Sequence, residues 1–325
     1  MSLAEAIKRE ARALGFSAVG ICRITDRTPP STDKSDTDSL PQRLYLRLQE
    51  WLQRGYHGTM AWMAREPSRR TDPRLVLPGC RSLISVGMNY DTGHRPTEGP
   101  GYGRVARYAW GKDYHQVLGD RLKQLEARIL DLAPGSLTRS YVDTGPIMEK
   151  AWAQEAGLGW IGKHSNLVSS EWGSWLLLGE VLTTLDLPPD QPGTDLCGSC
   201  SLCIQACPTG AIVEPYIVDA NRCISYLTIE FRGTREEIPD ELPSRMGHHI
   251  FGCDDCLDIC PFNLRADHTS EPVFAPSGLT QAPRLDELLN MDERTFHATF
   301  KDSPIRRAKY TGFRRNLRIA RQNQA

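Results

Sequence analysis

Apolar residues in the first part of the chain recur with both helical and strand-like spacing. Helical spacing predicts helices over Leu3–Leu14, which ends at Gly15, and over Arg43–Arg54. Between them, the apolar run Phe16–Ile24 predicts a strand, and the Pro-, Ser- and Asp-rich segment Thr28–Ser39 predicts a surface loop. A helix followed directly by a strand indicates a body of mixed α and β structure.

The same two spacings continue to about residue 186. Ser82–Asn89 and Trp175–Leu185 are apolar runs that predict strands. Tyr114–Leu132 has leucines on one face and predicts a long amphipathic helix. Arg139–Val142 predicts a short strand, and a further helix is expected from the turn at Pro146 to about Ala156. The prolines between residues 187 and 193 then mark a boundary.

Composition fits an ordinary globular protein. The 325 residues are 40% hydrophobic and 24% charged, which allows about two domains. The net charge is −1 and the mean hydropathy is −0.42, so a membrane protein is not expected. Charges interrupt the apolar positions of residues 1–10, which argues against a secretory signal. We therefore expect a cytoplasmic protein in a reducing compartment.

Charge is unevenly distributed along the chain. Residues 301–325 contain eight Lys or Arg and one acid, Asp302, so the other residues carry a net negative charge. A basic C-terminal segment on an acidic chain predicts a polyanionic partner. The alternative is an ordinary helix end whose charged face is solvated. Arg314, Arg315 and Arg318 are the candidate contacts to such a partner.

Eight of the ten cysteines lie between residues 197 and 260. Residues 197–208 have the pattern C-x2-C-x2-C-x3-C-P, which binds cubane clusters in bacterial two-cluster ferredoxins. The second group, Cys253-x2-Cys256-x3-Cys260-Pro261, lacks one cysteine, and Cys223 can supply the missing thiolate. The pattern predicts two [4Fe–4S] clusters, and a pair of zinc sites is the alternative. The isolated Cys22 and Cys80 are expected to be buried packing residues.

The fourth cysteine of each ferredoxin run ligates the other cluster, so the ligands are expected to cross. The expected first set is Cys197, Cys200, Cys203 and Cys260. The expected second set is Cys207, Cys223, Cys253 and Cys256. Clusters of this kind carry single electrons, so the preceding 195 or so residues should hold the reaction centre.

Asp143 is the strongest acid–base candidate in that N-terminal body. It closes an apolar strand and precedes a glycine and a helix start. Burial beside a cofactor would raise its pKa and let it donate a proton near neutral pH. The alternative is a structural turn or N-cap aspartate. The candidate polar groups of a pocket are Lys163, His164 and Asn166. A cofactor phosphate or another anion could be bound by Arg69 and Arg70. The alternative for both sets is that they are solvated loop residues.

Two motif-like segments in the body are weak. Gly157-x-Gly159-x-x-Gly162 is formally a dinucleotide fingerprint, but it follows a helix, so Gly157 is better explained as the C-terminal cap of that helix. Asp113-Tyr114-His115 resembles the start of the Asp-x-His-x-x-Gly motif, in which a histidine coordinates cobalt. The next glycine, Gly119, comes one residue too late, so His ligation is not supported.

Several segments together resemble the epoxyqueuosine reductase (QueG) family. They are Val142-Asp143-Thr144-Gly145-Pro146, Ala156-Gly157-Leu158-Gly159-Trp160-Ile161-Gly162-Lys163, the cysteine run, Arg222-Cys223-Ile224-Ser225-Tyr226-Leu227-Thr228, and the stretch from Arg107 to His115. The resemblance covers about residues 3–318. It implies reduction of the epoxide of epoxyqueuosine, at the wobble position of tRNAs with GUN anticodons, to queuosine.

The resemblance also implies a fold and cofactors. An α+β fold is expected, with a mixed-sheet, reductive-dehalogenase-like cobalamin-binding catalytic domain over residues 1–186. A ferredoxin-like domain over residues 187–265 would bind two [4Fe–4S] clusters, and residues 266–325 would form a basic helical tail. The cobalamin would be base-off in a cob(II)alamin resting state, and Co(I) formed with electrons from the clusters would act on the epoxide.

Individual residues can be carried over from the family pattern. Asp143 matches the proton donor, and Arg70 matches a cobalamin-contacting arginine. Leu167 and Leu178 lie where backbone touches the corrin, and Ile224 and Ser225 lie beside the second cluster, close to cobalamin. Ala106 stands where some members have a cysteine, so a thiol there is not essential.

The expected partners are the GUN-anticodon tRNAs for aspartate, asparagine, histidine and tyrosine, and an external low-potential electron donor. A monomer that does not bind membranes is expected. Three other functions remain open on sequence alone: a cobalamin-dependent reductive dehalogenase of small organohalides, a non-catalytic electron carrier, and an iron–sulfur nucleic-acid-binding module.

Overall fold

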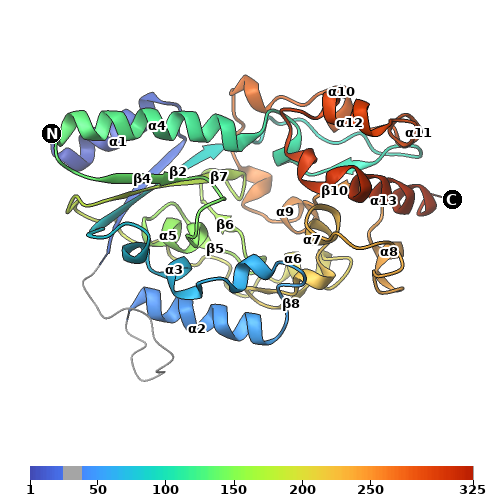
Figure 1. Ribbon diagram of the computed structural model, residues 1–325, viewed down its shortest axis with the longest axis horizontal. Helices are drawn as coiled ribbons and strands as arrows, with labels where there is room; N and C mark the ends of the chain where they lie inside the picture. The colour runs from blue at the N-terminus through green and yellow to red at the C-terminus, as the bar shows by residue number, and fades with distance from the viewer. Residues whose placement is uncertain (25–38, 325) are drawn as a thin grey trace.

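The computed structural model describes residues 1–24 and 39–324 (Figure 1). Its centre is a four-stranded antiparallel sheet with the strand order β1-β2-β7-β4. These strands are β1 (Ala18–Arg23), β2 (Ser82–Asn89), β4 (Thr138–Tyr141) and β7 (Leu176–Thr183). Apart from Ser39, the predicted loop over Thr28–Ser39 lies outside the described residues.

Helices cover both faces of the central sheet (Figure 1). One face packs on α1 (Leu3–Ala13) and α4 (Tyr114–Leu132), and the other packs on α5 (Glu149–Glu155), with α2 (Leu40–Gln53) and α3 (Pro67–Thr71) beyond it. Every residue of β2 is buried. Alternate side chains of β2 point to opposite faces, so Ile84 joins the core under α4 and Leu83 joins the core under α5. Because both faces of β2 are covered, its sequence is one continuous apolar run and does not alternate between apolar and polar residues.

The second half of the chain consists of short elements. They are α6 (Leu202–Ala206), β8 (Ile212–Glu214), β9 (Ile217–Val218), α7 (Ile224–Ile229), α8 (Leu242–Arg245), β10 (His249–Phe251), α9 (Asp255–Asp258), α10 (Gly278–Gln281), α11 (Leu285–Leu289), α12 (Glu293–Thr299) and α13 (Lys309–Gln322). The remaining short strands are β3 (Arg104–Val105), β5 (Trp160–Ile161) and β6 (Leu167–Val168). Apart from α13, these elements are short, and the eight clustered cysteines lie within or between them.

The two halves interlock through β3. This strand comes from the N-terminal half but pairs in parallel with β10, away from the central sheet. Val105, Ala109 and Trp110 belong to a buried cluster whose other buried members come from residues 250–320. The predicted boundary near residue 187 therefore describes the order along the chain and not the packing.

The basic C-terminal segment packs against the body. On α13, Arg315 is 7% exposed, and its guanidinium donates to the backbone oxygens of Phe231, Gly233 and Leu227. The prediction that Arg315 contacts a polyanion is wrong, because a buried guanidinium that satisfies three carbonyl groups is not available to a partner. Arg318, on the same helix, is exposed.

The α+β class predicted from the sequence is confirmed by the antiparallel central sheet and the helices that cover it. Helix α2 begins earlier than predicted, because the Ser39 side chain accepts the N–H of Gln42 and Pro41 suits the first turn. Helix α5 begins at Glu149 and not at Pro146, because residues 143–148 form bends. Within the described ranges, we find no helix with the length and apolar character needed to cross a membrane.

Candidate functional site

Asp143 lies immediately after β4, in the left-handed region of backbone conformation with φ = 54°. Its carboxyl group accepts a hydrogen bond from the Tyr114 hydroxyl at 2.9 Å and lies 3.4 Å from Nε2 of His115. Its backbone N–H donates to Oε1 of Glu149 at 2.5 Å. The first turns of α4 and α5 thus hold this aspartate from two sides, while its side chain remains 60% exposed.

His115 connects Asp143 to a second carboxylate. Asp113 caps α4 by accepting the backbone N–H of His115, and its Oδ1 also lies 2.7 Å from Nδ1 of the ring. Tyr114 stacks on the same ring, with the ring centres 4.1 Å apart. Both ring nitrogens of His115 therefore face carboxylates.

The electrostatics place the proton on histidine. Hydrogen bonds from His115 and Tyr114 lower the pKa of Asp143, and their effect exceeds that of the surrounding protein, which raises it. This is opposite to the rise expected from burial alone. Although burial favours neutral imidazole, the carboxylates of Asp113 and Asp143 raise the pKa of His115 to about 9. At neutral pH the cluster holds a protonated His115 beside an ionised Asp143.

This arrangement predicts a pH-dependent stability. The pKa of His115 rises from 6.5 to about 9 on folding, so its stabilising effect is complete below pH 6.5 and is lost as pH rises through 9. We expect the melting temperature of the wild type to fall more between these pH values than that of His115→Gln. Thermal unfolding at a series of pH values measures this, and equal falls in both proteins would contradict the assignment.

Lys150 lies between this cluster and the cysteines. Its Nζ donates to Oδ1 of Asn166 at 2.6 Å and to the carbonyl of Ser165 at 3.2 Å. The surrounding protein lowers the pKa of Lys150, while the charges of Asp143 and Cys256 act against that shift. Lys150 is therefore close to both, and the sequence analysis missed it. The signal available was a Glu-Lys pair that opens the helix after Asp143.

The first thiol group contains Cys197, Cys200, Cys203 and Cys260. Burial raises the pKa of Cys203, and the thiols of Cys197, Cys260 and Cys200 raise it further, so these four side chains are neighbours. The indole N–H of Trp160 points at the sulfur of Cys197 at 3.4 Å. Lys163, a candidate pocket residue, instead donates to the carbonyls of Gly198 and Cys200 and holds this loop.

The second thiol group contains Cys207, Cys223, Cys253 and Cys256. Burial raises the pKa of Cys256 well above its usual value, and Cys223 and Cys207 contribute to the rise. Burial and then the charge of Asp255 raise the pKa of Cys253, and Cys256 and Cys223 add to the rise. The structure thus brings together four thiols in each of the two sets that the crossed arrangement requires. The isolated Cys22 and Cys80 are buried, at 4% and 2% exposed, as predicted.

The predicted cofactor-contacting residues occupy three elements. Leu167 is buried on β6, and Leu178 on β7 is half-buried against the same apolar cluster. Ile224 and Ser225 open α7 directly after Cys223. The next residue of α7, Tyr226, contacts the backbone N–H of Thr59 through its hydroxyl at 2.7 Å, which joins α7 to the segment before α3.

Arg70 lies on α3. Its guanidinium donates to the carbonyl of Trp62 at 3.1 Å and lies over the Trp62 ring at 5.1 Å. Within the described part of the chain, its buried Nε has no hydrogen-bond partner, and neither has Nε2 of the buried His164. Since Nδ1 of His164 accepts the N–H of Asn166, its unpartnered Nε2 is the protonated nitrogen. These are two buried donors without acceptors.

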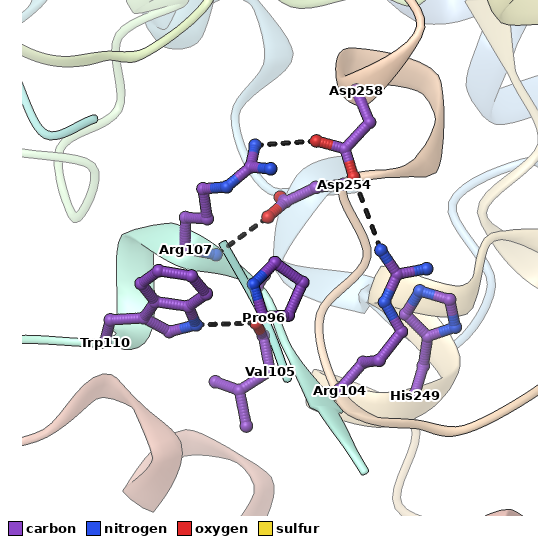
Figure 2. Close-up of a pocket in the computed structure, with 9 residues that line it drawn as sticks. Pro96, Arg104, Val105, Arg107, Trp110, His249, Asp254 and Asp258 are labelled. Atoms are coloured by element: carbon purple, nitrogen blue, oxygen red, sulfur yellow. Dashed lines mark hydrogen bonds and ion pairs between the residues drawn. The ribbon is translucent and has the colours of Figure 1, made fainter. Parts of the chain in front are cut away.

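A small polar pocket lies behind the second thiol group (Figure 2). Figure 2 shows Arg107 directed at Asp254 and Asp258: its backbone N–H donates to Asp254 at 2.8 Å, and its guanidinium lies 2.6 Å from Asp258. Arg104 reaches Asp258 from the other side at 3.4 Å. This network fixes the cysteine-bearing α9 against the N-terminal half. The network has a structural role, and Asp143 is not among the residues that line this pocket.

The glycine motif behaves as a helix end. Gly157 has φ = 81°, and its N–H bonds to the carbonyl of Gln154, as expected for a residue that follows α5. Gly159 lies so close to Gly193 that a Cβ on Gly193 would sit 1.7 Å from the Gly159 oxygen. The motif thus serves packing, as the sequence analysis favoured.

Two family models match the chain. The model described as "Epoxyqueuosine reductase QueG, DUF1730" matches residues 70–144, and the model described as "4Fe-4S double cluster binding domain" matches residues 196–263. The second match covers all eight clustered cysteines, from Cys197 to Cys260.

Curated relatives match over nearly the whole chain. An epoxyqueuosine reductase of Gloeobacter violaceus is 45% identical over 97% of this chain and 94% of its own length. An epoxyqueuosine reductase of Escherichia coli is 44% identical, over 99% of this chain and 81% of its own.

Solved structures agree. An epoxyqueuosine reductase with a tRNA-Tyr epoxyqueuosine-modified stem loop matches with a TM-score of 0.87 and 31% identity, over 99% of this chain and 81% of that chain. One from Bacillus subtilis, with its catalytic aspartate loop swung out of the active site, matches with a TM-score of 0.86 and 30% identity, over 99% and 82%. Reductive dehalogenase structures are distant, at TM-scores of 0.43 to 0.44. The chain therefore belongs to the epoxyqueuosine reductase family.

Proposed function

We propose that this protein reduces the epoxide of epoxyqueuosine in tRNA to the alkene of queuosine. The reaction takes two electrons and two protons and releases the epoxide oxygen as water. The observation that carries the proposal is the Asp143 carboxyl group, held by Tyr114 and His115, in a chain that also brings eight cysteines together in two groups. The charges of Asp143 and of Cys256 in the second thiol group both act on Lys150.

The thiols fit two [4Fe–4S] clusters. A single tetrahedral zinc ion, with Zn–S bonds of about 2.3 Å, would hold its sulfurs roughly 4 Å apart. In the described ranges, the one group of three potential ligand atoms within 4.8 Å of one another is His249, Cys253 and Asp255, so no three thiols approach that closely. The wider grouping suits a cubane, whose sulfur ligands surround four iron atoms.

We propose that cobalamin binds beside β6, β7 and α7, at the residues that the family resemblance assigns to it. Leu167, Leu178 and Ile224 offer apolar surface, Ser225 adjoins them, and the unpartnered donors of Arg70 and His164 suit the polar groups around a corrin. Bound there, cobalamin would supply a cobalt centre that takes up single electrons from the clusters. Both ring nitrogens of His115 are engaged by carboxylates, which supports binding without a histidine ligand.

The protein side chains handle the protons. Tyr114 and His115 orient the carboxyl group of Asp143, and protonated His115 keeps a proton 3.4 Å from it. As negative charge develops on the epoxide oxygen, the proton of His115 passes to the Asp143 carboxylate and from Asp143 to that oxygen. The low pKa of Asp143 suits such a relay, because the aspartate returns to its ionised form between transfers.

Basic residues near the site suit an RNA backbone. Arg307 is 56% exposed, pairs with Glu230 at 2.7 Å, and lies near enough to Asp143 for that charge to raise its pKa. Arg306 and Lys309 beside it are also exposed. We propose that this surface binds the phosphates of a GUN-anticodon stem loop, that the modified base enters the site, and that the protein acts as a monomer with an external low-potential donor.

Removing the Arg307 charge should weaken tRNA binding. We expect Arg307→Ala to reduce the slope of log Kd against log salt concentration by about 0.7 to 0.9, the effect of one lost phosphate contact. Lys123→Ala removes the same charge from a residue 78% exposed on α4 and serves as the control. Titrations of fluorescent stem loop at several salt concentrations measure the slopes, and equal slopes for the two variants would move the RNA surface elsewhere.

Substrate competition tests the function against a dehalogenase activity. Reduced, reconstituted protein is given epoxyqueuosine-containing tRNA and an aryl halide together. We expect the modified nucleoside to lose its epoxide oxygen and no halide to be released. Halide release with unchanged nucleoside would support the dehalogenase function instead.

A further inference from the structure

A pair of buried carboxyl groups lies directly behind Asp143. Glu180 is in the middle of β7, has no exposed surface, and pairs across the sheet with Ser85 on one side and Tyr141 on the other. Alternation along β7 places it on the face that packs against α5. Glu149 is the first residue of α5, which packs on β7, and its carboxyl group lies near enough to that of Glu180 for each to raise or lower the pKa of the other.

In the described part of the chain, no positively charged group contributes to the electrostatics of Glu180. Among the described residues, neither carboxyl oxygen of Glu180 meets a hydrogen-bond donor, and the nearby polar atoms of Ser85 and Trp152 have no partner either. Two carboxylates in contact in an apolar interior cannot both be ionised, because burial and mutual repulsion both oppose it. One of the two must carry a proton and donate it to the other.

The charges around the pair act in the same direction. Burial and then the neighbouring Glu149 raise the pKa of Glu180 well above its usual value. Burial and then the charge of Asp143 raise the pKa of Glu149 to about 7, and Lys150 opposes this rise. Tyr141 on β4 and the buried thiol of Cys22 on β1 are the other titratable groups that face the pair.

Glu149 also reaches the catalytic loop. Its Oε1 accepts the backbone N–H of Asp143 at 2.5 Å. Asp143 has a positive φ, a backbone conformation that is unfavourable for residues other than glycine. Glu180 holds Glu149, and Glu149 holds Asp143. In the Bacillus subtilis relative the catalytic aspartate loop is swung out of the active site, whereas here the Asp143 loop is held.

We propose that Glu149 and Glu180 share one proton and thereby hold the Asp143 loop in its working position, and that loss of this proton releases the loop. The proposal rests on the proposed function for the meaning of "working position". Glu149 and Glu180 are positioning residues: they act through the backbone of Asp143 and contact neither substrate nor cofactor. The pair would make the site sensitive to alkaline pH independently of His115.

Hydrogen exchange at the Asp143 amide tests the proposal without any turnover. We expect wild-type protein to protect this amide at neutral pH and to lose protection at alkaline pH, together with the infrared band of a protonated buried carboxyl group. Glu180→Gln removes that band but keeps a donor for Glu149, so protection persists at alkaline pH. Glu180→Leu, which leaves no donor, should raise the exchange rate of this amide about 10²-fold or more at neutral pH.

Two further variants keep the test decisive. Glu149→Leu removes the acceptor of the Asp143 N–H and should raise exchange even if Glu180→Leu fails to fold. Glu155→Gln, on the same helix, is the control and should leave both the band and the exchange unchanged, as should amides of β2 in every variant. A wild type without the carboxyl band at neutral pH, or an unchanged Asp143 amide in both leucine variants, would overturn the proposal. Loss of turnover in the wild type would instead refute only the proposed function.

Discussion

Replacing Asp143 with Ala is expected to lower the rate of epoxyqueuosine reduction by about 10²- to 10⁴-fold, the usual contribution of a positioned proton donor. The reason is geometric: the Asp143 carboxyl group contacts both the Tyr114 hydroxyl and the His115 ring, and its side chain is still exposed enough to reach a substrate. Iron and cobalamin content should be unchanged, since Asp143 belongs to neither thiol group. Single-turnover kinetics with reconstituted protein measure the effect.

Two further variants separate proton transfer from structure. Asp143→Asn retains an oxygen that can accept from Tyr114 but cannot deliver a proton, so we expect a similar loss of rate. Asp120→Ala, at an exposed acid on α4, should leave the rate unaltered. An Asp143→Asn enzyme as fast as the wild type would show that the proton reaches the epoxide oxygen by another route.

The crossed ligand sets predict a second large effect. Cys260 lies in the second cysteine run of the sequence, yet its neighbours in the structure are Cys197 and Cys200. We therefore expect Cys260→Ala to lose the first cluster and Cys207→Ala to lose the second. Each variant should retain about half the wild-type iron and should show no turnover, because the electron path is broken.

Spectroscopy can identify which cluster is missing. A cluster near Lys150 and α7 should respond to cobalamin binding, whereas the more distant one should not. Electron paramagnetic resonance of the reduced variants, with and without cobalamin, distinguishes the two. Cys80→Ala, at a buried thiol outside both groups, is the control and should keep all the iron. If Cys260→Ala and Cys207→Ala lost the same cluster, the crossed assignment would be wrong.

Features determined by local sequence pattern could be predicted well. Helix α4 and strand β2 have the predicted limits, because a leucine face and an uninterrupted apolar run each specify one structure. The two thiol sets follow from spacing because ligand runs are short and rigid. Asp143 was identifiable because it lies between a strand end and a Gly-Pro turn.

Features that depend on long-range contacts could not be predicted. The pairing of β3 with β10 joins residues about 145 positions apart in the chain. These strands have only two and three residues, which is too few to show a periodic pattern in the sequence. Arg315 resembles its exposed neighbours in sequence, and only the carbonyl groups of residues 227–233 make it a structural residue. The low pKa of Asp143 in the structure depends on His115, which lies 28 residues earlier in the chain, so the sequence pattern around Asp143 does not reveal it.

Buried charge is the least visible feature in the sequence. Glu180 interrupts an apolar strand, and nothing in the sequence pattern assigned it a role. Its significance depends on Glu149 meeting it from α5. Lys150 likewise gains its role from Asp143 on one side and Cys256 on the other. A charged residue within an apolar run is therefore a signal worth examining for a partner.

The most direct test of the central claim is the mass of the modified nucleoside after reaction. Protein reconstituted with iron, sulfide and cobalamin is reduced at low potential and given tRNA that contains epoxyqueuosine, and the digested nucleosides are analysed by mass spectrometry. We predict a product lighter than the substrate by one oxygen atom, formed only when both kinds of cofactor are present. An unchanged nucleoside with fully loaded, reduced protein would contradict the account.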